Sequence, residues 1–114
     1  MNQLRIMHFD VNQSLAFDEL KKNLLKLFPI TTIILYGSYA RREQDGESDI
    51  DLLIVTERVL LRHERNTITD IVFEINLKYD TNFSTLVVDN DSWESGYFTV
   101  LPIKQEILKD GVKL

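Results

Sequence analysis

Hydrophobic residues recur at helical spacing in the first third of the chain. The stretch opens at Ser14, a candidate N-cap, and closes at Phe28, because Pro29 cannot continue the hydrogen-bond ladder of a helix. Its apolar positions share one helical face: Phe17, Leu20, Leu24, Leu27 and Phe28. This pattern predicts an amphipathic helix over Ser14–Phe28 that packs against a core.

Two further helices and one short helical turn follow from similar patterns. An apolar stripe at Ile68, Ile71, Val72 and Ile75 predicts a helix over Val59–Tyr79. A last helix is expected to begin at Pro102, which suits a first turn, and to end at Gly111. Asp91 and Glu94 have the spacing of a capping box and predict a short helix before it.

Three segments rich in β-branched residues predict strands: Thr31–Leu35, Ile50–Val55 and Phe83–Val88. Residues 1–13 fit either a short strand or a loose helical turn, and the pattern leaves both open. The order of helix, two strands, helix, strand and short helices predicts an α/β (α+β) fold. We expect a small mixed β-sheet with helices packed mainly on one face.

Composition narrows the class of protein. The 114 residues are enough for one compact domain, which we expect to span residues 1–114. The net charge of −5 argues against nucleic acid as the main partner, since phosphate backbones are bound by clustered cations. The chain has no cysteine, which excludes disulfides and favours a reducing compartment. No run approaches the ~20 apolar residues of a membrane span, and no signal-peptide layout opens the chain, so we expect a cytoplasmic protein.

The candidate chemistry begins where the first predicted strand ends, at Gly37 and Ser38. Glycine lets the backbone turn sharply and approach a ligand closely, because it has no Cβ. Exposed N–H groups at this turn, and at the start of a short helix through Tyr39–Arg41, would form an anion-binding concavity. The Ser38 hydroxyl adds a donor. These features are suited to holding a triphosphate.

Asp49 and Asp51 are two residues apart at the start of the second predicted strand. The two-residue period of a strand sends both carboxylates to one face, while Ile50 and Leu52 point into the core. Two adjacent carboxylates repel each other unless a proton or cation lies between them. Mg²⁺ prefers oxygen ligands and is commonly held by one or two carboxylates together with substrate phosphates. The pair is therefore a candidate metal site.

The connection Tyr39–Ser48 is short enough to bring the glycine turn beside the two aspartates. Arg41 and Arg42 lie in this connection, and Arg41 is the stronger candidate for contact with an anionic ligand. Other singled-out residues have structural interpretations. His8 and His63 lack metal-ligand spacing, and Trp93 is expected to pack against the sheet.

Together these motifs resemble the signature of the DNA polymerase β-like nucleotidyltransferases. The residues that carry the resemblance are Gly37-Ser38, Ala40-Arg41 and Ser48-Asp49-Ile50-Asp51-Leu52. The chain most resembles the minimal nucleotidyltransferases (MNT), small proteins usually paired with a helical HEPN partner. The resemblance implies transfer of a nucleoside monophosphate, AMP from ATP, to a hydroxyl on the partner, with pyrophosphate released. It also implies that the protein acts as antitoxin to a HEPN toxin.

The resemblance assigns roles to individual residues. Gly37, Ser38 and Arg41 would bind the nucleotide, and Asp49 and Asp51 would be catalytic through Mg²⁺, with a second metal ion possible in this family. The sequence departs from the family pattern at two places. Arg42 stands where the family usually has glycine. The strand Phe83–Val88 has Ser84 or Thr85 where active members carry a third carboxylate, so Asp80 or Asp89 would have to substitute from another angle.

Two alternatives stay open at this point. The first is a non-catalytic nucleotidyltransferase-fold module that neutralises its partner by contact alone, which the missing third carboxylate favours. The second is a small-molecule nucleotidyltransferase that acts with a separate helical subunit. The intact Gly37-Ser38 turn and the Asp49/Asp51 pair favour the enzyme, since binding through a remote surface does not require them.

Overall fold

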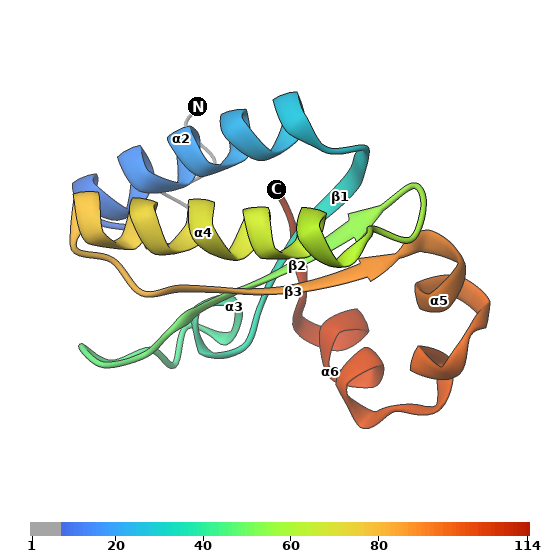
Figure 1. The fold of residues 1–114 in the computed structure, drawn as a ribbon. Helices are drawn as coiled ribbons and strands as arrows, with labels where there is room; N and C mark the ends of the chain where they lie inside the picture. Colours follow the sequence, from blue (N-terminus) through green and yellow to red (C-terminus); the bar gives the residue numbers. More distant parts are fainter. Residues whose placement is uncertain (1–7) are drawn as a thin grey trace.

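A four-stranded mixed sheet forms the centre of the computed structural model, which describes residues 8–114 (Figure 1). The strands lie in the order β3-β2-β1-β4. Their bounds are Ile30–Tyr36 for β1, Ile50–Thr56 for β2, Phe83–Asp89 for β3 and Val112–Lys113 for β4. β1 runs antiparallel to β2 and to β4, whereas β2 and β3 are parallel. The mixed sheet confirms the predicted fold class.

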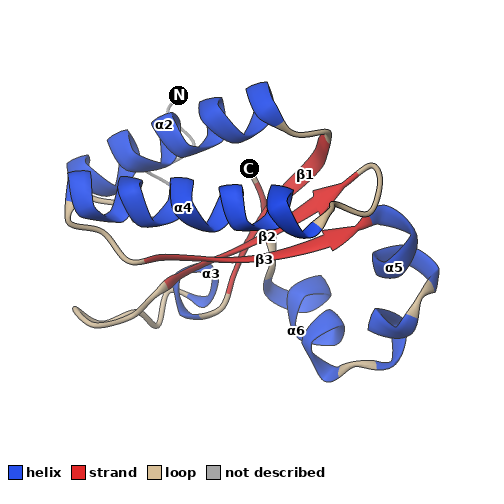
Figure 2. Cartoon of the chain, viewed as in Figure 1, coloured by secondary structure: helices blue, strands red, loops and turns tan. Residues whose placement is uncertain are grey.

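Two long helices lie side by side on one face of the sheet, as Figures 1 and 2 show. They are α2 (Val11–Leu27) and α4 (Arg62–Tyr79). Helix α4 connects β2 to the parallel strand β3. The short elements α5 (Asn90–Ser95), η1 (Tyr97–Val100) and α6 (Pro102–Asp110) pack below the other face. The prediction of helices mainly on one face is confirmed for the long helices, and the short ones cover part of the second.

Each face of the sheet carries its own hydrophobic cluster, and β2 belongs to both. Ile50, Leu52 and Ile54 pack under α2 and α4, whereas Leu53 and Val55 pack against α5, η1 and α6. All five are at most 2% exposed. A strand covered on both faces is apolar at nearly every position, which explains why Asp51 stands out as a charged residue within it.

Helix α2 begins earlier than predicted, and Asp10 caps it in place of Ser14. The Asp10 carboxylate accepts a hydrogen bond from the Gln13 N–H at 2.7 Å, and the Gln13 side chain accepts one from the Asp10 N–H at 2.9 Å. This reciprocal pair is a capping box, which satisfies donors at the helix start that Ser14 would leave unpaired. Of the strand and the helical turn that residues 1–13 allowed, the structure shows helix from Val11 onward. Leu4 and Ile6, on which the strand alternative rested, lie outside the described residues.

Two other predicted helix starts are also shifted. Helix α4 begins at Arg62 and not at Val59, because the Glu64 side chain accepts the Leu61 N–H at 2.9 Å and starts the helix there. Helix α5 is capped by Asp89, whose carboxylate accepts the Ser92 N–H at 3.0 Å, so the predicted capping box of Asp91 and Glu94 is wrong. Within the described part of the chain, none of the helices has the length and apolar character needed to cross a membrane.

Candidate active site

The turn that follows β1 lies against the first carboxylate of β2. Tyr36, the last residue of β1, is the register partner of Asp51, so the next residue, Gly37, falls beside the Asp51 side chain. Gly37 has a φ of +76°, which L side chains rarely adopt, and a Cβ at this position would overlap the Asp51 Oδ2. Glycine is therefore required here for two reasons, the backbone angle and the close approach.

Asp49 and Asp51 form a crowded acidic pair, as their spacing predicts. Burial raises the pKa of the Asp51 carboxyl, and the neighbouring charge of Asp49 raises it further, while Arg41 acts in the opposite direction. Asp49 directly precedes β2 and Asp51 is the second residue of the strand, so both carboxylates belong to the entrance to β2. Such a pair is an energetic liability in the free protein, and a bound cation would relieve it.

A single helical turn, α3 (Ser38–Arg41), carries the chain away from the glycine. Its closing bonds are made by the Arg41 N–H to the Gly37 carbonyl at 3.1 Å and by the Glu43 N–H to the Ser38 carbonyl at 2.9 Å. The first N–H groups of a helix have no partner within it. The predicted short helix is confirmed, and the Ser38 hydroxyl lies at its first position.

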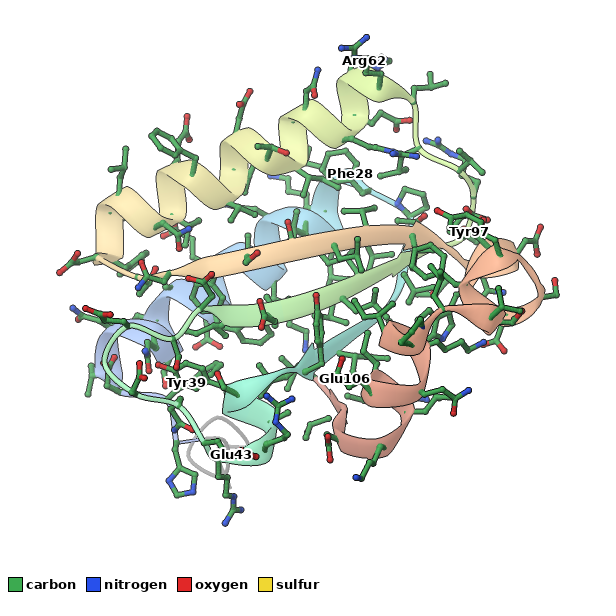
Figure 3. All side chains as sticks on the ribbon, turned by 90° about the horizontal axis from the view of Figure 1, so that it is seen from below. Phe28, Tyr39, Glu43, Arg62, Tyr97 and Glu106 are labelled. Atoms are coloured by element: carbon green, nitrogen blue, oxygen red, sulfur yellow. The ribbon has the colours of Figure 1, made fainter. Side chains whose placement is uncertain are left out.

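Tyr39 fixes this turn to the protein core. Its ring is buried and stacks edge-on against Phe9, with ring centroids 5.9 Å apart, and its hydroxyl accepts a hydrogen bond from the Gln13 side chain at 2.9 Å. Tyr39 is part of this short helix, and Figure 3 shows it close to the loop that carries Glu43. These two contacts join α3 to Phe9 and to Gln13 of α2, and they therefore fix the position of the Gly37 turn.

The loop between α3 and β2 is ordered by Ser48, the first residue of the Ser-Asp-Ile-Asp motif. Its hydroxyl oxygen accepts the Asp45 N–H at 2.9 Å and donates to the Asp45 carboxylate at 3.3 Å. The role of Ser48 is thus to shape the turn that delivers Asp49 to the site. Sequence reasoning placed Ser48 in the motif without a role, although Asp and Ser at this spacing are a common turn signal.

Arg42 follows α3 in the left-handed conformation, with φ at 59°. Glycine is the residue that adopts this conformation without strain, which is why glycine is usual here in the family and why Arg42 is strained. The Arg42 side chain is exposed. The departure from the family pattern therefore places backbone strain at the edge of the site.

Arg41 lies among carboxylates. Its Nε is 3.3 Å from Glu43 Oε1, and its Nη1 is 3.6 Å from Glu106 Oε1. Glu106 belongs to α6, far along the chain, and sequence reasoning did not identify it. Helix α6 packs on the face of the sheet that carries Leu53 and Val55, which is also the face of Asp51. Burial raises the pKa of the Tyr36 hydroxyl, and the charges of Asp51 and Glu106 raise it further.

The place of the missing third carboxylate is held by Ser84. Ser84 on β3 is the parallel register partner of Asp51, and its side chain is exposed. Asp89 cannot substitute, because it lies at the opposite end of β3 and caps α5. Asp80 ends α4 in the left-handed conformation and is exposed. Among residues 8–114, no three acidic or histidine side chains gather as a metal-binding group.

Other residues singled out from the sequence have structural roles. Trp93 and Phe98 are buried against the sheet, whereas Tyr97 is exposed and stacks on Phe98 with ring centroids 4.7 Å apart. His8 and His63 are exposed. A cavity of about 360 Å³ lies near the far ends of β2 and β3, between the start of α4 and η1, and none of the candidate site residues lines it.

The donor set fits a divalent cation bound together with a phosphate group. The two carboxylates would supply oxygen ligands, and the space that a Cβ at Gly37 would fill adjoins that of Asp51. A small mixed sheet that carries a glycine-serine turn and an Asp-x-Asp pair at the same end is the arrangement of nucleotidyltransferases. This class of protein is therefore the one that the fold and the site define.

Comparisons with known proteins lead to the same class. The family model described as a nucleotidyltransferase domain matches residues 17–113. Two curated proteins of Methanocaldococcus jannaschii, both provisionally named protein adenylyltransferases, are similar to the chain. One is 35% identical over 71 residues, which cover 60% of this chain and 72% of the relative. The other is 36% identical over 62 residues, which cover 53% of this chain and 42% of the relative. The chain belongs to the nucleotidyltransferase domain family.

Solved structures share the fold at low sequence identity. A toxin–antitoxin complex with AMP-PNP contains a chain that aligns with a TM-score of 0.59 at 19% identity, over 87% of this chain and 69% of that one. A complex of a tri-AMPylated Shewanella oneidensis HEPN toxin with its MNT antitoxin aligns with a TM-score of 0.53 at 19% identity, over 87% and 68%. A provisionally described nucleotidyltransferase from Sulfolobus solfataricus aligns with a TM-score of 0.52 at 18% identity, over 97% and 80%.

Proposed function

We propose that the protein is a Mg²⁺-dependent nucleotidyltransferase that moves AMP from ATP to a hydroxyl group of a helical partner, and that the partner is a HEPN toxin silenced by this change. The observation that carries the proposal is the contact between the Gly37 turn and the carboxylate of Asp51, itself crowded by Asp49. The names of the Methanocaldococcus relatives and the AMPylated toxin of Shewanella oneidensis support AMP as the transferred group.

Each candidate residue has a separate task in this proposal. Gly37 and Ser38 bind the triphosphate through backbone N–H groups and the Ser38 hydroxyl, and Arg41 binds a phosphate oxygen with its guanidinium. Asp49 and Asp51 hold Mg²⁺. When bound, Mg²⁺ supplies positive charge that stabilises the negative charge developing on the phosphate oxygens.

The reaction is a displacement at the α-phosphorus. The hydroxyl oxygen of the partner forms a bond to this phosphorus, the bond from phosphorus to the bridging oxygen breaks, and pyrophosphate leaves with the electron pair. The hydroxyl proton passes to solvent or to the partner, because Ser84 opposite Asp51 is not a base at neutral pH. A positioned base contributes about 10²–10⁴-fold in rate, so we expect slow transfer.

The test is label transfer to a HEPN-type partner, which is to be sought among the proteins encoded beside this chain. The protein is incubated with ATP labelled at the α-phosphate, Mg²⁺ and the partner, and the label on the partner is measured. Wild type should transfer label, and Asp49→Ala with Asp51→Ala should not. Asp70→Ala, which removes an exposed carboxylate from α4, is the matched control and should behave as wild type.

The second candidate function is neutralisation of the partner by contact alone, and the serine opposite Asp51 favours it. The double aspartate variant separates the two functions. If it still neutralises the toxin and wild type transfers no label, contact is the mechanism. Label found on a small molecule in place of the partner would favour a small-molecule nucleotidyltransferase.

A further inference from the structure

Helix α6 brings a carboxylate to the candidate site from the far end of the chain. Arg41, which the proposed function assigns to the nucleotide, is held between Glu43 at 3.3 Å and Glu106 at 3.6 Å. The Arg41 side chain is only 32% exposed, whereas Glu106 is 64% exposed. The Arg41 side chain is therefore less exposed than the Glu106 carboxylate that it contacts.

Glu106 and Asp51 both act on Tyr36, which ends the strand just before Gly37. Burial raises the pKa of the Tyr36 hydroxyl, and the charges of Asp51 and Glu106 raise it further. Arg41 lowers the pKa of the Asp51 carboxyl against the effects of burial and Asp49. Arg41 is therefore in ion-pair contact with Glu43 and Glu106, and its charge also acts on Asp51.

We propose that Glu106 competes with the nucleotide for Arg41: its carboxylate occupies the guanidinium in the free protein and gives way when a phosphate oxygen takes its place. This inference rests on the proposed function, because it takes Arg41 as a phosphate ligand. Phosphate and carboxylate bind a guanidinium in the same way, through charge-assisted hydrogen bonds, so one excludes the other at a given N–H edge. Glu106 is then a residue that sets nucleotide affinity without touching the nucleotide.

The sign of the expected effect is diagnostic. Removing a side chain that only supports the fold weakens binding, whereas removing a competitor strengthens it. Exposed ion pairs are typically worth 0.2–1 kcal/mol, which corresponds to an affinity gain of up to about fivefold. The gain should shrink as salt is added, because salt screens exposed charges.

The experiment measures binding of ATP with Mg²⁺, without partner, by calorimetry. Glu106→Gln should bind about two- to fivefold more tightly than wild type. In an Arg41→Ala background, Glu106→Gln should change nothing, since the contested cation is gone. Glu94→Gln, which removes an exposed carboxylate from α5, is the matched control for net charge and should bind as wild type.

A second readout needs no nucleotide. The NMR signal of the Arg41 Nη1–H group, which faces Glu106, should move in Glu106→Gln and stay in place in Glu94→Gln. Unchanged or weaker ATP binding in Glu106→Gln would overturn the inference, as would an equal gain in the Arg41→Ala background. Failure of wild type itself to bind ATP with Mg²⁺ would instead overturn the proposed function, while the NMR signal would still report whether Glu106 holds Arg41.

Discussion

Ser84 lies directly opposite Asp51 in the parallel register of β3 and β2. The two side chains share the face of the sheet that Leu86 and Leu53 continue further along the strands. A carboxylate at position 84 would therefore stand beside the Asp49/Asp51 pair, and serine is what this chain has there. This relationship defines the simplest change that could complete the site.

Ser84→Asp should increase the rate of AMP transfer to the partner by at least about 10²-fold, the lower contribution of a positioned base. Thr85→Asp is the matched control. Thr85 is one residue along and points toward the face under α2 and α4, so its replacement should give no gain and should destabilise the fold. Label-transfer rates and urea unfolding of both variants check this. A Ser84→Asp variant with no transfer would favour neutralisation by contact.

Gly37→Ala should lose ATP binding and destabilise the protein by about 1–3 kcal/mol, because the added Cβ overlaps the Asp51 carboxylate and φ is +76°. Gly46→Ala is the control within the same loop region, since a Cβ there meets nothing within 4 Å. It should bind ATP as wild type and unfold at the same denaturant concentration or a slightly higher one. Equal behaviour of the two variants would contradict the assigned geometry.

Asp51→Asn should abolish Mg²⁺-dependent ATP binding and leave the free protein as stable as wild type or more so. The folded-state pKa of Asp51 is raised, so its ionised form is disfavoured by folding. The resulting loss of folding free energy is absent at pH values below the ordinary aspartate pKa. It grows as the pH rises toward the raised pKa of the folded state and is complete above that raised pKa. The stabilisation by asparagine should therefore appear at pH 7, below about 1 kcal/mol because solvent screens the pair, and vanish at pH 3.

Urea unfolding of wild type and Asp51→Asn at both pH values is the measurement. A large loss of stability at pH 7 would show that Asp51 supports the fold and would weaken its assignment as a metal ligand. Asp70→Asn serves as the control, because it removes an exposed carboxylate from α4, outside the candidate site.

Arg42→Gly should stabilise the protein by about 0.5–1 kcal/mol. A non-glycine residue at φ of 59° costs about 1–2 kcal/mol, and the greater freedom of glycine in the unfolded chain offsets part of the gain. Arg42→Ala keeps the strained angle and removes the guanidinium, so it should show no such gain. Thermal unfolding of the two variants separates backbone strain from charge, and a destabilised Arg42→Gly would contradict the strain assigned here.

Much of the architecture follows from local patterns. Pro29 ends the first helix and Pro102 starts the last, because proline restricts the backbone wherever it stands. Asp49 and Asp51 reach the same place because a strand has a period of two residues. The predicted start of the first helix was wrong because two residues near it are both suitable N-caps. Asp10 and Ser14 are both acceptable caps, and only the hydrogen bonds with Gln13 decide between them.

What the tertiary structure decided is the neighbourhood of the site. Nothing in the order of residues indicates that Glu106 meets Arg41, because that contact depends on how α6 packs across the face of the sheet. The sequence left Ser84 and Thr85 as equal candidates for the third position. The parallel register of β2 and β3 selects Ser84, since a shift of one residue would send that side chain to the opposite face. Strand register and helix packing depend on contacts between residues that are far apart in the sequence, so the local hydrophobic periodicity cannot predict them.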